Sequence, residues 1–217
     1  MNVYPMQTAY SQANPSPRYR ELIAQYQQLH SQGAVEHGLS PQQTFPGQSL
    51  LEHIGPLVQL VEQGAMRTML DYGCGKAMLY RPQNRIELPD GRSADTLQGL
   101  LGVNVTLYDP AYLPYAMRPH GQFDLVVCTD VLEHCSSEDI GWILGDLFQY
   151  AHGFVYANIA CYAAKKTLPN GENAHCLVRD VEWWQAEISA VAQAFPGVGY
   201  RFLCTYGDGR QFVISSS

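Results

Sequence analysis

The amino-acid sequence predicts an α/β fold: a doubly wound, mostly parallel sheet with helices on both faces and a C-terminal antiparallel hairpin. Three observations lead to this prediction. Short apolar runs recur along the chain, and most of them end at a glycine or an acidic residue, as buried parallel strands do. Stretches with apolar residues at helical spacing separate these runs. The last two apolar runs are joined by the short turn Gly207-Asp208-Gly209, which is typical of a hairpin.

The strands follow from the apolar runs themselves. Parallel strands are expected at residues 67–72, 103–108, 124–129 and 153–159. Residues 200–206 and 211–215 would form the final hairpin.

The helices follow from periodicity and from cap residues. Ser16-Pro17 is typical of a helix start, and the face that follows comprises Tyr19, Leu22, Ile23, Tyr26 and Leu29. Pro56 should kink the helix of residues 50–61 or mark its start, because proline lacks a backbone donor, and Gly64 should close it. Further helices are expected at 94–101 and 181–195. Ser136 or Ser137 should cap another, whose buried face would be Ile140, Ile143, Leu144, Leu147, Phe148 and Ala151.

A chain of 217 residues fits a single domain. Its expected parts are a flexible tail at 1–15, an N-terminal helical cap at 16–64 and a sheet-bearing core at 65–217. Within the core, Pro82, Pro89 and Asp90-Gly91 interrupt the pattern, so an insertion is expected at about 77–100.

Composition restricts the partners and the compartment. The formal net charge is −7 and basic residues cluster only at Lys165-Lys166, so there is no strong nucleic-acid signature. No signal peptide and no apolar run long enough to cross a bilayer is present, so no membrane partner is expected. The six cysteines form no Cys-x-x-Cys pair, and scattered free cysteines favour a cytoplasmic location.

Three segments place polar groups and glycines after the expected strands. The first strand runs into Asp71-Tyr72-Gly73-Cys74-Gly75, where glycine lets the backbone approach a ligand closely. The second strand ends at Asp109, and the third leads through residues 123–129 into Asp130-Val131-Leu132-Glu133-His134. Ligands of such sheets bind beyond the carboxyl ends of the strands, so Asp71 and Asp109 should belong to one crevice.

In order and spacing, these segments resemble the cofactor site of the class I S-adenosylmethionine-dependent methyltransferases, over about residues 66–160. The resemblance implies a Rossmann-like fold, with S-adenosylmethionine as the cofactor and S-adenosylhomocysteine as the product. It also implies that Gly73, Cys74 and Gly75 lie against the methionine portion of the cofactor, and that Asp71 orients its amino group. Asp109 would bind the ribose hydroxyls, and Asp130 would belong to the same site.

The sequence departs from the family pattern in two places. Ala77 stands where the family often has a third glycine. Between Asp109 and Phe123 the family usually has a third strand and helix, but here Pro110, Pro114 and Pro119 crowd the interval, so this unit should be abbreviated or missing. A residue of that unit commonly contacts the adenine.

His134 and His175 are the candidate catalytic residues. A histidine titrates near neutral pH, so either could deprotonate a nucleophile. The alternatives are a structural hydrogen bond for His134 and a solvated loop position for His175. Glu133 is expected to be structural, although in a few relatives such a residue helps to hold a metal. No metal is expected, because a zinc site of His134, His175, Cys161 and Cys176 would lack a recognised spacing.

The resemblance implies methyl transfer to an O or N atom of a small-molecule or nucleotide-like acceptor, which the N-terminal helices and the 77–100 insertion would cover. Three alternatives stay open: a methyltransferase acting on a nucleic acid or protein, a non-catalytic protein that binds S-adenosylmethionine, and aminopropyl transfer or cofactor cleavage. The sequence does not indicate an oligomeric state.

Overall fold

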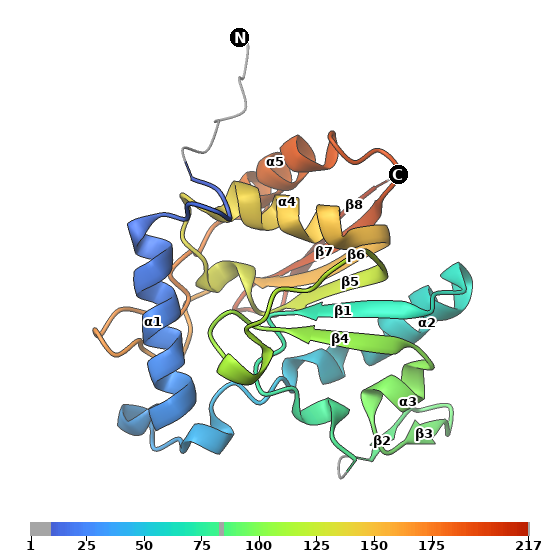
Figure 1. Cartoon of the computed structure of the whole chain (residues 1–217), viewed down its shortest axis with the longest axis horizontal. Coiled ribbons are helices and arrows are strands. Elements are labelled where there is room, and N and C mark those ends of the chain that lie inside the picture. Colours follow the sequence, from blue (N-terminus) through green and yellow to red (C-terminus); the bar gives the residue numbers. More distant parts are fainter. Residues whose placement is uncertain (1–9, 83–84, 217) are drawn as a thin grey trace.

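A six-stranded sheet lies at the centre of the computed structural model, which describes residues 10–82 and 85–216 (Figure 1). In spatial order its strands are β4 (Asn104–Tyr108), β1 (Thr68–Tyr72), β5 (Phe123–Thr129), β6 (Ala151–Ala160), β7 (Gly199–Thr205) and β8 (Gln211–Ser215). The first five are parallel, and β8 pairs antiparallel with β7 at the edge. The predicted α/β class, the mostly parallel sheet and the C-terminal antiparallel pair are therefore confirmed.

Helices cover both faces of this sheet. Alternate residues of β1 point to opposite sides, so Leu70 joins one apolar cluster and Met69 joins another. The helices α4 (Ile140–Tyr150) and α5 (Val181–Ala192) supply the first cluster, whereas α2 (Ile54–Gly64) and α3 (Leu97–Leu101) supply the second. Six of the seven residues of β5 are buried, as a strand covered on both faces requires.

The first helix, α1 (Pro17–Gln32), lies across the carboxyl ends of the parallel strands (Figure 1). Its predicted start is confirmed, because the Ser16 hydroxyl accepts the backbone N–H of Tyr19 and Pro17 is the first helical residue. The buried carboxylate of Asp139 holds this end: Oδ1 accepts the Ser16 N–H at 3.0 Å, and Oδ2 accepts its hydroxyl at 2.5 Å. The N-terminal end of α1 is thereby attached to the residue that precedes α4.

Two details of the helix predictions were wrong. The helix after β5 begins at Ile140 with Asp139 in the cap position, not Ser136 or Ser137, because Ser136 instead accepts the N–H of Glu138 in the preceding turn. Ala151 belongs to β6 and not to the buried face of α4, although it is buried as expected.

The second helix begins close to the predicted proline. A 3₁₀ helix, η3 (Ser49–His53), leads into α2, and Pro56 is the third residue of α2, where its missing donor breaks no helical bond. Gly64 is the last helical residue, and Ala65 follows it in a left-handed conformation with φ 48°.

The insertion packs beside α2. It contains the 3₁₀ helix η4 (Met78–Tyr80), a small antiparallel pair of β2 (Ile86–Glu87) and β3 (Ser93–Ala94), and then α3; residues 83 and 84 lie outside the described part. Leu79, Ile86 and Leu97 join the same apolar cluster as Leu57 of α2. This segment therefore extends the core on one face of the sheet.

The connection between β4 and β5 is as short as expected. Among the described residues it holds only the 3₁₀ helix η5 (Leu113–Tyr115), and β4 is the edge strand. Arg118 fastens it to α4, with a 2.9 Å ion pair to Asp146 and its guanidinium over the rings of Tyr108 and Tyr150 at 5.8 and 5.5 Å. The prediction of an abbreviated third unit is confirmed.

The described chain begins at residue 10, with a short turn before α1. Residues 1–9 of the predicted flexible tail lie outside the described part, and Ser11 and Asn14 close a turn through backbone bonds of 3.1 and 3.0 Å. No helix in the described ranges has the length and apolar character that crossing a bilayer demands.

Candidate functional site

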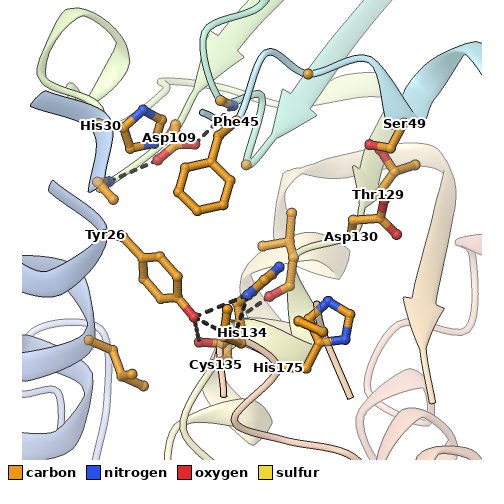
Figure 2. Close-up of a pocket in the computed structure, with 18 of the residues that line it drawn as sticks. Tyr26, His30, Phe45, Ser49, Asp109, Thr129, Asp130, His134, Cys135 and His175 are labelled. Carbon is orange, nitrogen blue, oxygen red and sulfur yellow. Dashed lines mark hydrogen bonds between the residues drawn. The ribbon is translucent and has the colours of Figure 1, made fainter. Parts of the chain in front are cut away.

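A cavity of about 460 Å³ lies between α1 and the carboxyl ends of the parallel strands (Figure 2). This volume lies in the range of about 300–1,000 Å³ that is usual for small-molecule sites. The lining comes from α1, from residues 45–49, from the turns after β1, β4 and β5, and from residues 162–175. Of the cofactor-binding and catalytic residues proposed from the sequence, those that line it are Gly73, Gly75, Asp109, Asp130, His134 and His175.

The glycine turn after β1 is shaped by contacts with its own chain. A Cβ on Gly73, whose φ is 83°, would lie 2.3 Å from Cγ2 of Val131. A Cβ on Gly75, whose φ is 56°, would lie 2.5 Å from the carbonyl oxygen of Phe45. Ala77 is also left-handed at φ 51°, at the position where the family pattern has a third glycine. The turn thus needs glycine for packing and for backbone conformation, whether or not a ligand approaches it.

Asp109 connects the end of β4 to the glycine turn. Its Oδ2 accepts the N–H of Gly75 and its Oδ1 accepts that of Ala111, both at 2.9 Å. Burial raises the pKa of this carboxyl, and the two N–H donors oppose that rise because they stabilise the charged form. Asp109 therefore caps the glycine turn and also forms part of the cavity wall.

Asp71 and Cys74 lie behind the turn and do not line the cavity. The carboxylate of Asp71 accepts the hydroxyl of Tyr80 at 2.8 Å, away from the cavity. Burial raises the pKa of Asp71 to about 7, and the Tyr80 hydrogen bond opposes the rise. Burial also raises the pKa of the Cys74 thiol.

The opposite side of the cavity contains the two histidines (Figure 2). Their rings are nearly perpendicular, at 83°, with centroids 4.9 Å apart. Nδ1 of His134 lies 2.7 Å from the carbonyl oxygen of Ala174, and Nδ1 of His175 lies 2.6 Å from that of Tyr162. A carbonyl oxygen can only accept, so Nδ1 carries the proton in both rings. Burial, with a smaller contribution from His175, lowers the pKa of His134 to about 3, so this ring is neutral at physiological pH.

Asp130 lies between the two sides, at the end of β5. It adopts a left-handed conformation with φ 54°, which is uncommon for a residue other than glycine. Its Oδ1 accepts the side-chain amide of Asn158 on β6 at 2.5 Å. The strained turn points the chain toward Glu133 and His134, which follow in the 3₁₀ helix η6 (Leu132–His134).

Several lining residues were missed by the sequence reasoning. Tyr26 of α1 donates its hydroxyl to the Ala174 carbonyl at 2.8 Å, and its ring packs edge-on against Phe45 and His134. His30, one turn later, lies 3.0 Å from Nζ of Lys76, and burial lowers its pKa to about 3. A sequence signal for these residues exists: Tyr26 and His30, four positions apart, place polar groups on an otherwise apolar helix face.

The cavity wall comes from only part of the segments expected to cover it. Five residues of α1 line it, whereas no described residue between 77 and 100 does. Lys165 and Lys166, the basic pair noted in the sequence, also line it, and Nζ of Lys166 lies 4.9 Å from the centre of the Phe45 ring.

The chain matched no family model, no curated protein and no solved structure. Fold and site together define an α/β protein with a cavity of small-molecule size at the carboxyl ends of a mostly parallel sheet.

Proposed function

We propose that this chain is a Rossmann-like, cytoplasmic methyltransferase that uses S-adenosylmethionine to methylate an O or N atom of a small-molecule or nucleotide-like acceptor. One observation carries the proposal. The segments that follow β1, β4 and β5, represented by Gly75, Asp109 and Asp130, all line the same cavity. These are the segments whose order and spacing resemble the family's cofactor site.

The carboxylate of Asp109 has acceptor positions that its present hydrogen bonds do not use. An ionised carboxylate offers about four lone-pair positions. Two of these accept backbone N–H groups, from Gly75 and Ala111. The remaining two suit a pair of vicinal hydroxyls such as those of a ribose, which supports a nucleoside-bearing ligand at this side of the cavity.

The histidine side suits the acceptor. When it is bound, S-adenosylmethionine supplies an electrophilic methyl group, so the protein must mainly align a nucleophile and receive its proton. His134 holds a proton poorly, because burial lowers its pKa to about 3. We therefore assign proton acceptance to Nε2 of His175, whose Nδ1 is held by the Tyr162 carbonyl, and orientation of the acceptor to His134.

Calorimetric titration with S-adenosylmethionine and, separately, with S-adenosylhomocysteine tests the proposal. We expect binding of both in the micromolar range. Asp109→Ala should weaken both by at least about 100-fold, because two hydrogen bonds to a charged group contribute about 1.5–3 kcal/mol each. Asp208→Ala, which removes an exposed carboxylate in the turn between β7 and β8, is the matched control and should bind normally.

Failure of the folded wild-type protein to bind either ligand would overturn the proposal. Binding of both without turnover on any acceptor, followed with a labelled methyl group, would instead support the non-catalytic alternative.

A further inference from the structure

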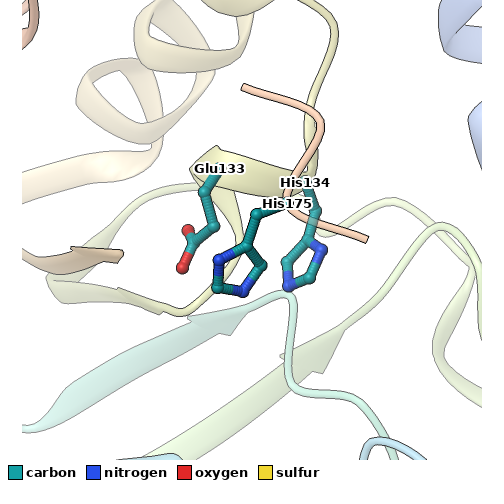
Figure 3. Close-up of side chains that lie close together, drawn as sticks. All are labelled: Glu133, His134 and His175. Atoms are coloured by element: carbon teal, nitrogen blue, oxygen red, sulfur yellow. The ribbon is translucent and has the colours of Figure 1, made fainter. Parts of the chain in front are cut away.

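Three side chains gather on the histidine side of the cavity in a way that methyl transfer does not require. Glu133, His134 and His175 each offer one potential ligand atom, and these atoms lie within 4.8 Å of one another (Figure 3). Glu133 and His134 come from η6, directly after β5, whereas His175 comes from the loop that follows β6. The fold therefore brings together residues about 40 positions apart in the sequence.

Glu133 is the most unusual member of this cluster. Its side chain is fully buried, and Oε1 accepts the backbone N–H of Ala160 at 3.0 Å. Its Oε2 is buried and has no hydrogen-bond partner among the described residues. An unpaired buried polar group costs about 1–3 kcal/mol of stability, and more when it is charged. The absence of a partner for Oε2 of Glu133 therefore calls for a structural explanation.

The two histidines are oriented as metal-binding histidines usually are. Each donates Nδ1–H to a backbone carbonyl, that of Ala174 for His134 and that of Tyr162 for His175. This leaves the Nε2 lone pair of each neutral ring as the atom available for coordination. A backbone carbonyl on the other ring nitrogen is the common way to fix the tautomer and the ring orientation of a ligating histidine.

We propose that Glu133, His134 and His175 form a binding site for one divalent transition-metal ion of the Zn²⁺ type. Two imidazole nitrogens and one carboxylate oxygen suit such ions better than Mg²⁺ or Ca²⁺, which favour oxygen ligands. With metal–ligand distances of about 2.0–2.2 Å, the ligand atoms must come within about 3.5 Å of one another, so the side chains close by roughly 1 Å on loading. Both histidines line the cavity, so the open coordination position faces it.

The site differs from the zinc site weighed on sequence grounds, which combined His134 and His175 with Cys161 and Cys176. The cluster in the structure contains Glu133 in place of both cysteines. The thiol of Cys176 points instead to the carbonyl oxygen of Cys135, at 3.3 Å. No spacing in the sequence indicates this cluster, because contacts with residues distant in the sequence position the loop that carries His175.

The test uses the full-length, metal-free protein, titrated with Zn²⁺ by calorimetry and with Co²⁺ by visible absorption. We expect one ion per chain, and Co²⁺ bands without thiolate-to-metal charge transfer. Glu133→Gln and His175→Gln should each weaken Zn²⁺ binding by at least about 100-fold, since even the loss of a residue that only orients a ligand costs about 10–100-fold. His37→Gln, which changes a histidine outside the cluster, is the matched control and should leave the affinity unchanged.

Two results would overturn the proposal: no stoichiometric Zn²⁺ binding by the folded wild-type protein, or binding that survives both substitutions and is lost in Cys176→Ser. Glu133→Gln keeps Oε1 as the acceptor of the Ala160 N–H. If the Glu133→Gln protein does not fold, the His175→Gln variant tests the proposal alone, because position 175 is not fully buried and tolerates the change. The site does not depend on the proposed methyl transfer, but Nε2 of His175 either coordinates the metal or accepts a proton, because its one lone pair cannot do both. Titration of the metal-free protein with S-adenosylmethionine therefore separates a failure of one from a failure of the other.

Discussion

The two sides of the cavity are built differently. On the glycine side, formed by Gly73, Gly75 and Asp109, the space left by missing side chains is filled by the chain itself, and the Asp109 carboxylate already accepts two backbone N–H groups. On the histidine side, formed by Glu133, His134 and His175, a buried oxygen has no partner among the described residues, and two ring nitrogens remain available. The glycine side should therefore contribute strongly to stability without a ligand, whereas the histidine side should gain most of its order from what binds there.

The largest expected effect is that of Gly73→Ala on stability. The new Cβ would meet Val131 at 2.3 Å and would sit at a φ of 83°. The left-handed conformation costs about 1–2 kcal/mol and overpacking about 1–3 kcal/mol, so the free energy of unfolding should fall by about 2–5 kcal/mol. Urea unfolding measures it.

Gly121→Ala is the matched control for this change. Gly121 has the same φ of 83°, but nothing lies within 4 Å of its Cβ position, so only the conformational cost of about 1–2 kcal/mol should appear. If both variants lost the same stability, the glycine side would not be closed by its own packing, and the contrast between the two sides would fail.

An intermediate effect is expected from the pH dependence of Asp71, which lies behind the glycine turn. Its pKa is about 7 in the folded chain, against an ordinary value of 3.8. Between these two pH values the folded state keeps a proton that the unfolded state has released. The stability that this provides is fully present below pH 3.8 and is lost as pH rises through about 7. Asp71→Asn cannot ionise, so its pH profile should lack this loss.

The measurable quantity is the unfolding free energy of the wild type minus that of Asp71→Asn. It should decrease by about 1.4 kcal/mol per pH unit inside this window, on the order of 4 kcal/mol in all. Urea unfolding at several pH values from 4 to 8 provides it, and contributions of other titrating groups cancel in the subtraction. A difference independent of pH would mean that Asp71 is not buried behind the turn.

The smallest effect concerns Tyr26→Phe on the histidine side. The change removes one hydroxyl that donates to the Ala174 carbonyl, which also accepts from His134. Stability should fall by only about 0.5–1.5 kcal/mol, the usual net contribution of one hydrogen bond. Zn²⁺ affinity should fall by about 10-fold or less, since His134 keeps its own bond to Ala174. A stability loss as large as that of Gly73→Ala would show that the histidine side, too, is built mainly by internal packing.

The sheet could be predicted because its signals are local. β1 and β5 are buried apolar runs and β4 is a half-buried run at the sheet edge, and the residues that follow them, including Asp109 and Asp130, are next to them in the sequence. The cap of α4 could not be predicted, because Asp139 is engaged by Ser16, 123 residues away. His175 was named from its residue type, but its meeting with Glu133 depends on the path of a loop and on the Tyr162 carbonyl.

The short connection from β4 to β5 has a consequence for how the chain can vary. Two parallel neighbours of the same strand need a crossover of about a dozen residues or more, and residues 109–122 supply fourteen. The three prolines in this connection reduce the conformational freedom that it loses on folding. The ion pair of Arg118 with Asp146 holds the connection against α4, where a helix would otherwise do so. Insertions should be tolerated at this position, whereas deletions of a few residues should prevent β4 and β5 from flanking β1 together.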